Sequence, residues 1–239
     1  MGGRKKRVPD SIRVADWNAG PGRDRDEVAK QVRHLIRDTE RPEVVTLHEV
    51  WLYQAAIVDA ISDYQWFRVS REKAGHHKHA DTIIGVRGNV KARRVGALIQ
   101  RLRWTGPKSP TPKNQPGRVW PVVALGRKWL IMSPHKVTGG VGGRNPDAAQ
   151  EEHDAIIALA NSRRARRRAL VMPGDWNAPA HSKHKRAPAQ VARLIGGKIV
   201  QSGGGVDLAV VRDCRGGGMR LGKYGSDHHA RLYSLIRGR

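Results

Sequence analysis

Apolar positions recur along the chain in two spacings, one typical of helices and the other of strands. Between Asp24 and Asp38, four apolar residues at positions 28, 32, 35 and 36 fall on one face of a helix. Further helices are expected at residues 52–61, 145–161 and 191–195, and Asn145-Pro146 offers an N-cap and a first-turn proline for the second of these.

Short apolar or alternating runs bounded by turn residues predict strands throughout the chain. The expected strands cover residues 12–17, 43–48, 64–69, 82–86, 95–102, 119–125, 129–133, 170–172, 206–211 and 231–236. Strands predominate, several are paired, and helices fall between them. We therefore expect a single domain over residues 11–239, with two packed sheets flanked by helices, after a basic flexible tail at residues 1–10.

Charge is the strongest feature of the composition. The 239 residues include 45 Lys and Arg against 21 Asp and Glu, a formal net charge of +24. Such a chain is attracted to polyanions, nucleic acid first and an anionic membrane surface second, although generic basicity of an Arg-rich genome is the alternative. With 38% hydrophobic residues the chain can bury a core, which excludes a wholly disordered basic tail.

The number of cysteines and the length of the apolar runs indicate the cellular setting. The lone Cys214 excludes an intramolecular disulfide. No run reaches the ~18 apolar residues of a membrane span, and no apolar segment follows the basic N-terminus as in a signal peptide. We expect a cytoplasmic protein, and the richness in Arg, Gly and Ala suggests a bacterial or phage source.

The clearest candidate chemistry lies in two motifs near strand ends. Asp175 and Asn177 follow the apolar run 169–172, and side chains two residues apart on a strand point the same way. Together they could bind a metal and orient water, although the same residues also form simple turns. Asp227 and His228, just before the last strand, offer an oxygen ligand beside a titratable base, or else a polar turn.

Other polar residues occupy the ends of apolar strands. Asp207 begins the run 206–211, where a buried acid is costly unless it is paired, and a histidine partner would account for it. Asn18, Glu49 and His135 each end a buried strand. Taken singly, each is more simply explained as a satisfied residue at the edge of the core.

The order of these residues along the chain changes that interpretation. Asn, then Glu, His, Gly-Asp-Trp-Asn, a strand-starting Asp and Ser-Asp-His resembles the endonuclease/exonuclease/phosphatase superfamily. That superfamily includes the DNase I-like nucleases and the exonuclease III-type AP endonucleases. The resemblance runs from about Arg13 to Leu235, and Gly117-Arg118 before a strand also looks like the Gly-Arg step of the family.

The resemblance implies a four-layer α/β sandwich, in which two face-to-face mixed sheets lie between helices. It also implies hydrolysis of a phosphoester with Mg²⁺ or Mn²⁺. Carried over by position, Glu49 would be the main metal ligand, with Asn18 beside it and Asp227 as a further ligand.

The same resemblance assigns the remaining residues to catalysis. Asp175 and Asn177 would hold the attacking water and the scissile phosphate. His228 would be the general base or acid, oriented by Asp207, and His135 would donate to a phosphate oxygen.

Four positions bear on the subfamily, and one of them, His135, stands where many AP endonucleases use a Tyr-containing segment and looks more like the DNase I branch. His48 stands where the family often has Gln, Ala230 where it often has Pro, and Gly20 where many AP endonucleases have an acid. These departures leave the subfamily open.

Basic residues supply candidate contacts to nucleic acid. They are Arg118, Arg163, Arg164, Arg166, Arg167 and Arg168. The run at 163–168 is either an electrostatic handle for a phosphate backbone or a solvated helix end that complements the helix dipole.

The leading hypothesis is a monomeric, metal-dependent nuclease acting on DNA rather than RNA. A phosphatase or phospholipid phosphodiesterase of the same fold is one alternative, because the site residues do not define the substrate. A non-catalytic nucleic-acid-binding module is the other, although every position of the inferred site holds a competent residue.

Overall fold

The computed structural model describes residues 7–20, 23–50, 52–69, 82–99, 119–136, 146–180, 187–201 and 203–238. These residues form two six-stranded sheets. The first sheet has the order β11 (Cys214–Arg220), β12 (Arg231–Arg237), β1 (Ser11–Asn18), β2 (Val44–His48), β4 (Ile83–Arg87) and β3 (Tyr64–Phe67). The second has the order β5 (Ala92–Ile99), β6 (Val119–Leu125), β7 (Trp129–Met132), β8 (Ala169–Asp175), β10 (Asp207–Arg212) and β9 (Lys198–Val200).

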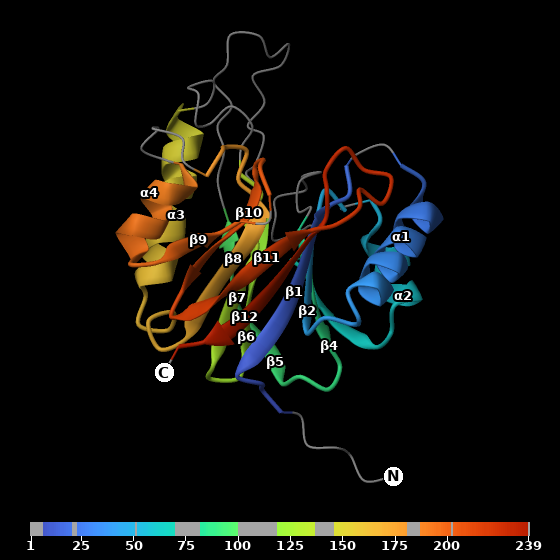
Figure 1. Ribbon diagram of the computed structural model, residues 1–239, viewed down its shortest axis with the longest axis horizontal. Helices are drawn as coiled ribbons and strands as arrows, with labels where there is room; N and C mark the ends of the chain where they lie inside the picture. The colour runs from blue at the N-terminus through green and yellow to red at the C-terminus, as the bar shows by residue number, and fades with distance from the viewer. Residues whose placement is uncertain are drawn as a thin grey trace.

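Both sheets are mixed. The only parallel pairs among the named strands of the described residues are β1 with β2 and β7 with β8. The helices are α1 (Arg25–Asp38), α2 (Gln54–Ala60), α3 (Pro146–Asn161) and α4 (Pro188–Ile195). Figure 1 shows α1 and α2 outside the first sheet and α3 and α4 outside the second. This is the four-layer α/β sandwich that the sequence predicts.

Helix α1 illustrates how local sequence sets an element. The side chain of Asp24 accepts hydrogen bonds from the backbone amides of Asp26 and Glu27, which satisfies two donors at the helix start. The apolar face predicted from the spacing is buried. Packing of that face against the first sheet, rather than intrinsic helix propensity, supplies most of the stability of such a helix.

Three apolar cores separate the four layers. The central core lies between the sheets and takes side chains from both, including Val14, Val44, Ile131, Val171 and Ala209. The other two lie between each sheet and its own helices. Each central strand is therefore buried on both faces, which explains its near-continuous apolar sequence.

Two strands were not expected from the sequence. β11 contains three consecutive glycines and is largely exposed, so it carries neither the composition nor the alternation of a strand. It forms because its backbone pairs with β12 at the edge of the first sheet. β9 is only three residues long and pairs with β10.

The predicted N-terminal tail meets the domain before residue 11. Arg7 forms a parallel bridge with Val90, and the indole of Trp129 donates a hydrogen bond to the carbonyl of Pro9 at 2.9 Å. Asp10 pairs with Lys128 at 2.9 Å. Residues 7–10 are thus held against the domain. Among the described helices, none is long and apolar enough to cross a membrane.

Close packing at Gly174 gives a test of this fold. A Cβ atom there would lie 2.0 Å from the carbonyl oxygen of Pro134, which belongs to the backbone following β7. We expect Gly174→Ala to destabilise the fold by about 1–3 kcal/mol through overpacking, measured as a lower midpoint of urea denaturation. Gly217→Ala is the control, since a Cβ there meets nothing within 4 Å. Equal midpoints for the two variants would contradict the close approach.

Candidate active site

The layer between the sheets changes from apolar to polar at one end. Along β1, Ile12 and Val14 belong to the central core, and strand alternation puts Asp16 and Asn18 on the same face. The same alternation applies to β2, β7, β8 and β10. It brings to one end of the layer the residues Thr46, His48, Ser133, His135, Asp175 and Asp207.

A buried histidine joins the two sheets at this end. The Nε2 atom of His48 lies 3.0 Å from Oδ1 of Asp16 in the first sheet and 3.0 Å from Oγ of Ser133, which follows β7 in the second. Its Nδ1 lies 3.3 Å from the hydroxyl of Thr82, and Ser133 also donates to the carbonyl of Pro173 at 3.0 Å. Sequence analysis assigned no role to Asp16 or Ser133, and it noted His48 only as a departure from a family pattern.

Two predicted acids, Glu49 and Asp175, both lie close to the side chain of Asn18. The carboxamide nitrogen of Asn18 lies 3.2 Å from Oδ2 of Asp175 and 3.4 Å from Oε1 of Glu49. The Nε2 atom of His135 also reaches both acids, at 3.4 Å from Glu49 and 3.7 Å from Asp175. Residues at the ends of β1, β2 and β8 and after β7 therefore converge on one point between the sheets.

The backbone is shaped to present these groups. Glu49 and Asn177 adopt φ angles of 57° and 48°, in the left-handed region that non-glycine residues rarely occupy. The amide of Asn177 donates to Oδ1 of Asp175 at 2.8 Å, and its carboxamide donates to the carbonyl of Lys136 at 2.7 Å. Strained residues of this kind concentrate at functional sites.

Lys136 is a site neighbour that the sequence did not indicate. Its side chain is among the fully buried ones, and its ammonium group lies 5.8 Å from the ring centroid of Trp176. A lysine directly after the strand-ending His135 has no feature in the sequence that distinguishes it from the many surface cations.

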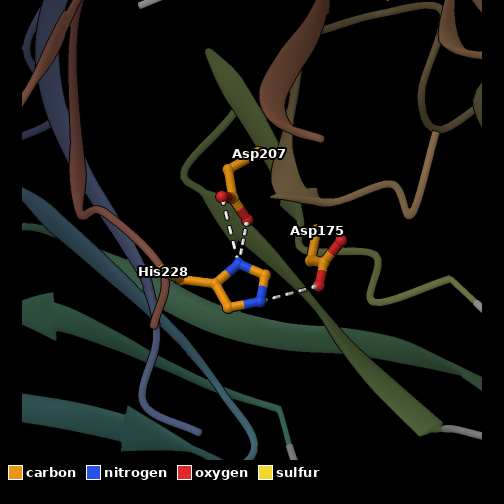
Figure 2. Close-up of side chains that lie close together, drawn as sticks. All are labelled: Asp175, Asp207 and His228. Atoms are coloured by element: carbon orange, nitrogen blue, oxygen red, sulfur yellow. Dashed lines mark hydrogen bonds and ion pairs between the residues drawn. The ribbon is translucent and has the colours of Figure 1, made fainter. Parts of the chain in front are cut away.

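His228 and Asp207 form a pair across the two sheets. Nδ1 of His228 lies 3.1 Å from each carboxylate oxygen of Asp207, and Nε2 lies 3.9 Å from Oδ2 of Asp175 (Figure 2). The next residue, His229, instead lies with its Nδ1 2.8 Å from the carbonyl of Leu221. Of the two neighbouring histidines, His228 is the one that points at the acids.

The charges of this pair set its proton affinity. The hydrogen bond to Asp207 raises the pKa of His228 to about 9 against the opposing effect of burial, and the charges of Asp207, Asp175 and Asp227 add to the rise. At neutral pH the imidazole therefore holds its proton. Burial favours a higher pKa for Asp175, but the charge of His135, the amide of Asn177 and the charge of His228 outweigh it and lower the pKa.

Asp227 lies beside the end of β1. Its Oδ1 is 3.2 Å from the hydroxyl of Ser226, which donates to the carbonyl of Asn18 at 2.7 Å. A Cβ at Gly20 would come within 3.4 Å of the same carboxylate oxygen. The carboxylate of Asp227 is exposed, unlike that of Asp175.

The donor set fits a hard divalent cation. Glu49 and Asp175 supply carboxylate oxygen atoms on either side of the carboxamide nitrogen of Asn18, and oxygen is the ligand atom that Mg²⁺ and Mn²⁺ prefer. Asp175, Asp207 and His228 also offer ligand atoms within 4.8 Å of one another. Asp207 already engages Nδ1 of His228, so its carboxylate is less available to a cation than those of Glu49 and Asp175.

The structure separates the predicted nucleic-acid contacts from these residues. Residues 163–168 lie between α3 and β8, at the start of β8, whereas Asp175 ends that strand. Figure 1 shows this segment at the lower end of the second sheet, with the segment before β12 at the upper end. Arg118 lies outside the described residues.

Known structures share this architecture. The complex of D. rerio TDP2 with a single-strand DNA product superposes with a TM-score of 0.65 at 14% identity, over 94% of this chain and 98% of that chain. The human Nocturnin catalytic domain with bound sulfate has a TM-score of 0.64 at 15% identity, over 96% of both chains. The endonuclease/exonuclease/phosphatase protein from Bacteroides vulgatus has 0.64 at 14% identity, over 95% of this chain and 99% of that chain.

These likenesses establish the class of fold. The chain has the DNase I-like fold of these structures, which confirms the fold that the resemblance of its motifs implied. No protein-family model and no curated protein matches the sequence.

The proton affinity of His228 can be measured directly. In metal-free protein we expect its imidazole to titrate near pH 9 rather than at the ordinary 6.5, followed by histidine NMR resonances. Because the folded pKa is raised, the stability that this proton contributes is fully present below pH 6.5 and is lost as the pH rises through about 9.

Two variants test the cause of that shift. Asp207→Asn should move the titration of His228 back toward its ordinary range, since the main cause of the shift is removed. His229→Gln should leave the titration unchanged, because that ring faces Leu221. An ordinary pKa for His228 in the unsubstituted protein would contradict the pairing.

Proposed function

We propose that the protein is a metal-dependent phosphodiesterase that cleaves nucleic acid, DNA in preference to RNA. One observation carries the proposal: the His228–Asp207 pair directs Nε2 of the imidazole at Asp175, where Glu49 and Asn18 also converge. A histidine held by one acid and aimed at a second cluster of acids is an arrangement that general acid–base catalysis of phosphoester hydrolysis can use.

Each residue has a role that follows from its contacts. Asp207 fixes the ring of His228 through Nδ1, which leaves Nε2 to give its proton to the leaving oxygen when the imidazole is charged, or to take one from the attacking water when it is neutral. Asp175, held by the amide of Asn177, orients that water. His135, buried beside both acids, donates to a phosphate oxygen.

Glu49 and Asn18 are the residues we assign to a bound Mg²⁺ or Mn²⁺, with Asp227 completing the set from the exposed side. A cation held there would neutralise negative charge that develops on the phosphate oxygens. The chain itself supplies the proton transfer and the orientation of water and phosphate.

Charge favours a polymeric substrate. A net charge of +24 suits a chain of phosphates better than a small phosphate ester, which disfavours the phosphatase alternative. The similar fold of the TDP2 structure that contains a single-strand DNA product supports DNA as the substrate class. We further propose that residues 11–239 form one monomeric domain that acts in the cytoplasm.

The proton-transfer pair should behave as one unit. His228→Ala should slow nicking of plasmid DNA by roughly 10²–10⁴-fold, the usual scale for general acid–base catalysis. Asp207→Asn should also be slower, and combining it with His228→Ala should add little. His229→Gln is the matched control. Loss of cleavage in His229→Gln with activity retained in His228→Ala would overturn the assignment.

Metal dependence separates an enzyme from a binding module. With EDTA in excess, or with Glu49→Gln, we expect the protein to bind DNA but not to cut it, because the basic surface needs no cation. Gel shift and nicking assays on the same plasmid measure the two properties. Full cleavage in EDTA would contradict a metal site, and absence of cleavage with either Mg²⁺ or Mn²⁺ would favour the non-catalytic module.

Substrate class needs a parallel comparison. Plasmid DNA, single-stranded DNA, RNA and sphingomyelin vesicles should be offered to the same preparation. We expect DNA to be cleaved fastest. Faster hydrolysis of the phospholipid would favour the phosphodiesterase alternative.

A further inference from the structure

Five arginines surround a hollow at the end of the molecule remote from the candidate active site. The hollow has a volume of about 620 Å³, and the described residues that line it are Arg127, Arg163, Arg164, Arg167 and Arg168. They come from the turn between β6 and β7 and from the segment between α3 and β8. Two segments that are far apart in the sequence thus place arginine side chains around the same hollow.

The fold holds part of this cluster rigidly. Arg168 donates from Nε to the carbonyl of Gly126 at 3.3 Å and from Nη1 to the carbonyl of Arg164 at 2.8 Å. Arg164 in turn donates to the carbonyl of Val95 in β5. These bonds tie the two loops and the edge of the second sheet together.

The positive charge of the cluster is not balanced within the described part of the chain. None of the five arginines there forms an ion pair with a carboxylate, although neighbouring Lys128 pairs with Asp10. Burial lowers the pKa of Arg168, and the charges of Arg93, Arg164, Arg127 and Arg167 lower it further. Like charges gathered at this density repel one another unless an anion lies between them.

Guanidinium groups select the chemistry of that anion. Their planar donor forks match phosphate oxygens in pairs, and several forks around one open hollow suit repeated phosphates better than a single one. A nucleic acid backbone presents such a series, with one charge per roughly 1.7 Å of duplex axis.

Strand geometry fixes how far the hollow lies from the cleavage point. Arg168 immediately precedes β8 and Asp175 ends it, so the two residues are seven steps apart along the strand. At about 3.3 Å per residue the separation is roughly 20 Å, or on the order of six base pairs at 3.4 Å each.

We propose that this arginine hollow is an exosite that binds the backbone of the substrate nucleic acid at a distance from the bond that is cut. The proposal rests on the nuclease function proposed above. It makes affinity depend on substrate length: duplexes too short to reach the hollow bind only at the active site, and longer ones gain the arginine contacts.

A length series tests the exosite. Duplexes carry one ordinary phosphodiester bond, with phosphorothioate linkages elsewhere that keep the charge and resist cleavage, and they extend from that bond by increasing numbers of base pairs. We expect KM to fall once the extension exceeds roughly six base pairs, while kcat stays constant.

The variant Arg127→Gln, Arg163→Gln, Arg167→Gln removes three exposed members of the cluster and spares the two that hold the loops. We expect it to abolish the fall in KM with length. On long duplexes, the slope of log affinity against log salt should decrease by roughly 0.9 for each phosphate contact that is lost.

The matched control removes the same charge from the same end of the sheets without touching the hollow. Arg193→Gln, Lys198→Gln, Arg215→Gln changes three exposed cations around β9 and β11. We expect it to retain the fall in KM. If both variants lost the fall in KM with length equally, net charge alone would explain the effect and the exosite would be wrong. A KM independent of length in the unsubstituted protein would also overturn the exosite.

Binding in EDTA separates this proposal from the nuclease function. Fluorescence anisotropy of the same duplexes reports affinity without cleavage. Length-dependent binding that requires the three arginines would uphold the hollow as a nucleic-acid site even if no duplex were ever cut. Cleavage without any such dependence would uphold the nuclease and overturn the exosite.

Discussion

The site depends on the satisfaction of polar groups that the sandwich buries between its sheets. At one end of the central layer, alternation along five strands replaces apolar side chains with acids, amides, hydroxyls and histidines. A buried polar group without a partner costs about 1–3 kcal/mol, so these residues are stable there only as a connected set. His48 makes the central connection, because its ring reaches Asp16 in one sheet and Ser133 beyond a strand of the other.

Bonds across the layer also explain how the fold controls chemistry. His228 precedes β12 in the first sheet and Asp207 begins β10 in the second, so the proposed base and the acid that orients it belong to different sheets. Asn18 and Asp175 bridge the same gap. The spacing of the two sheets therefore sets the distances within the candidate active site, and the apolar core below holds that spacing constant. A site built in this way is as rigid as the packing beneath it.

The sequence predicted the architecture and most of the converging residues, and the reasons for its failures are physical. Strand-ending Asn18, Glu49, His135 and Asp175 were recognisable because each polar residue interrupts an apolar run. The supporting residues Ser133 and Lys136 were harder to recognise, because a Ser or Lys after a strand interrupts no recognisable pattern. Their contacts depend on how the sheets pack, which the local sequence does not show. β11 was missed for a related reason: its glycines pair only because β12 offers a free edge. Long-range pairing is information that local propensity does not contain.

The two ends of the sandwich carry charged side chains of opposite sign. At the polar end the fold gathers carboxylates, which repel a phosphate backbone unless cations accompany them. At the other end it gathers arginines that no described acid balances, which attract the same backbone. A molecule arranged in this way holds a polyanion most favourably when the polymer spans both ends, because the distant arginines then offset the repulsion at the acids. In the nuclease proposed above, charge on the remote surface would therefore add to substrate affinity without changing the charges around His228.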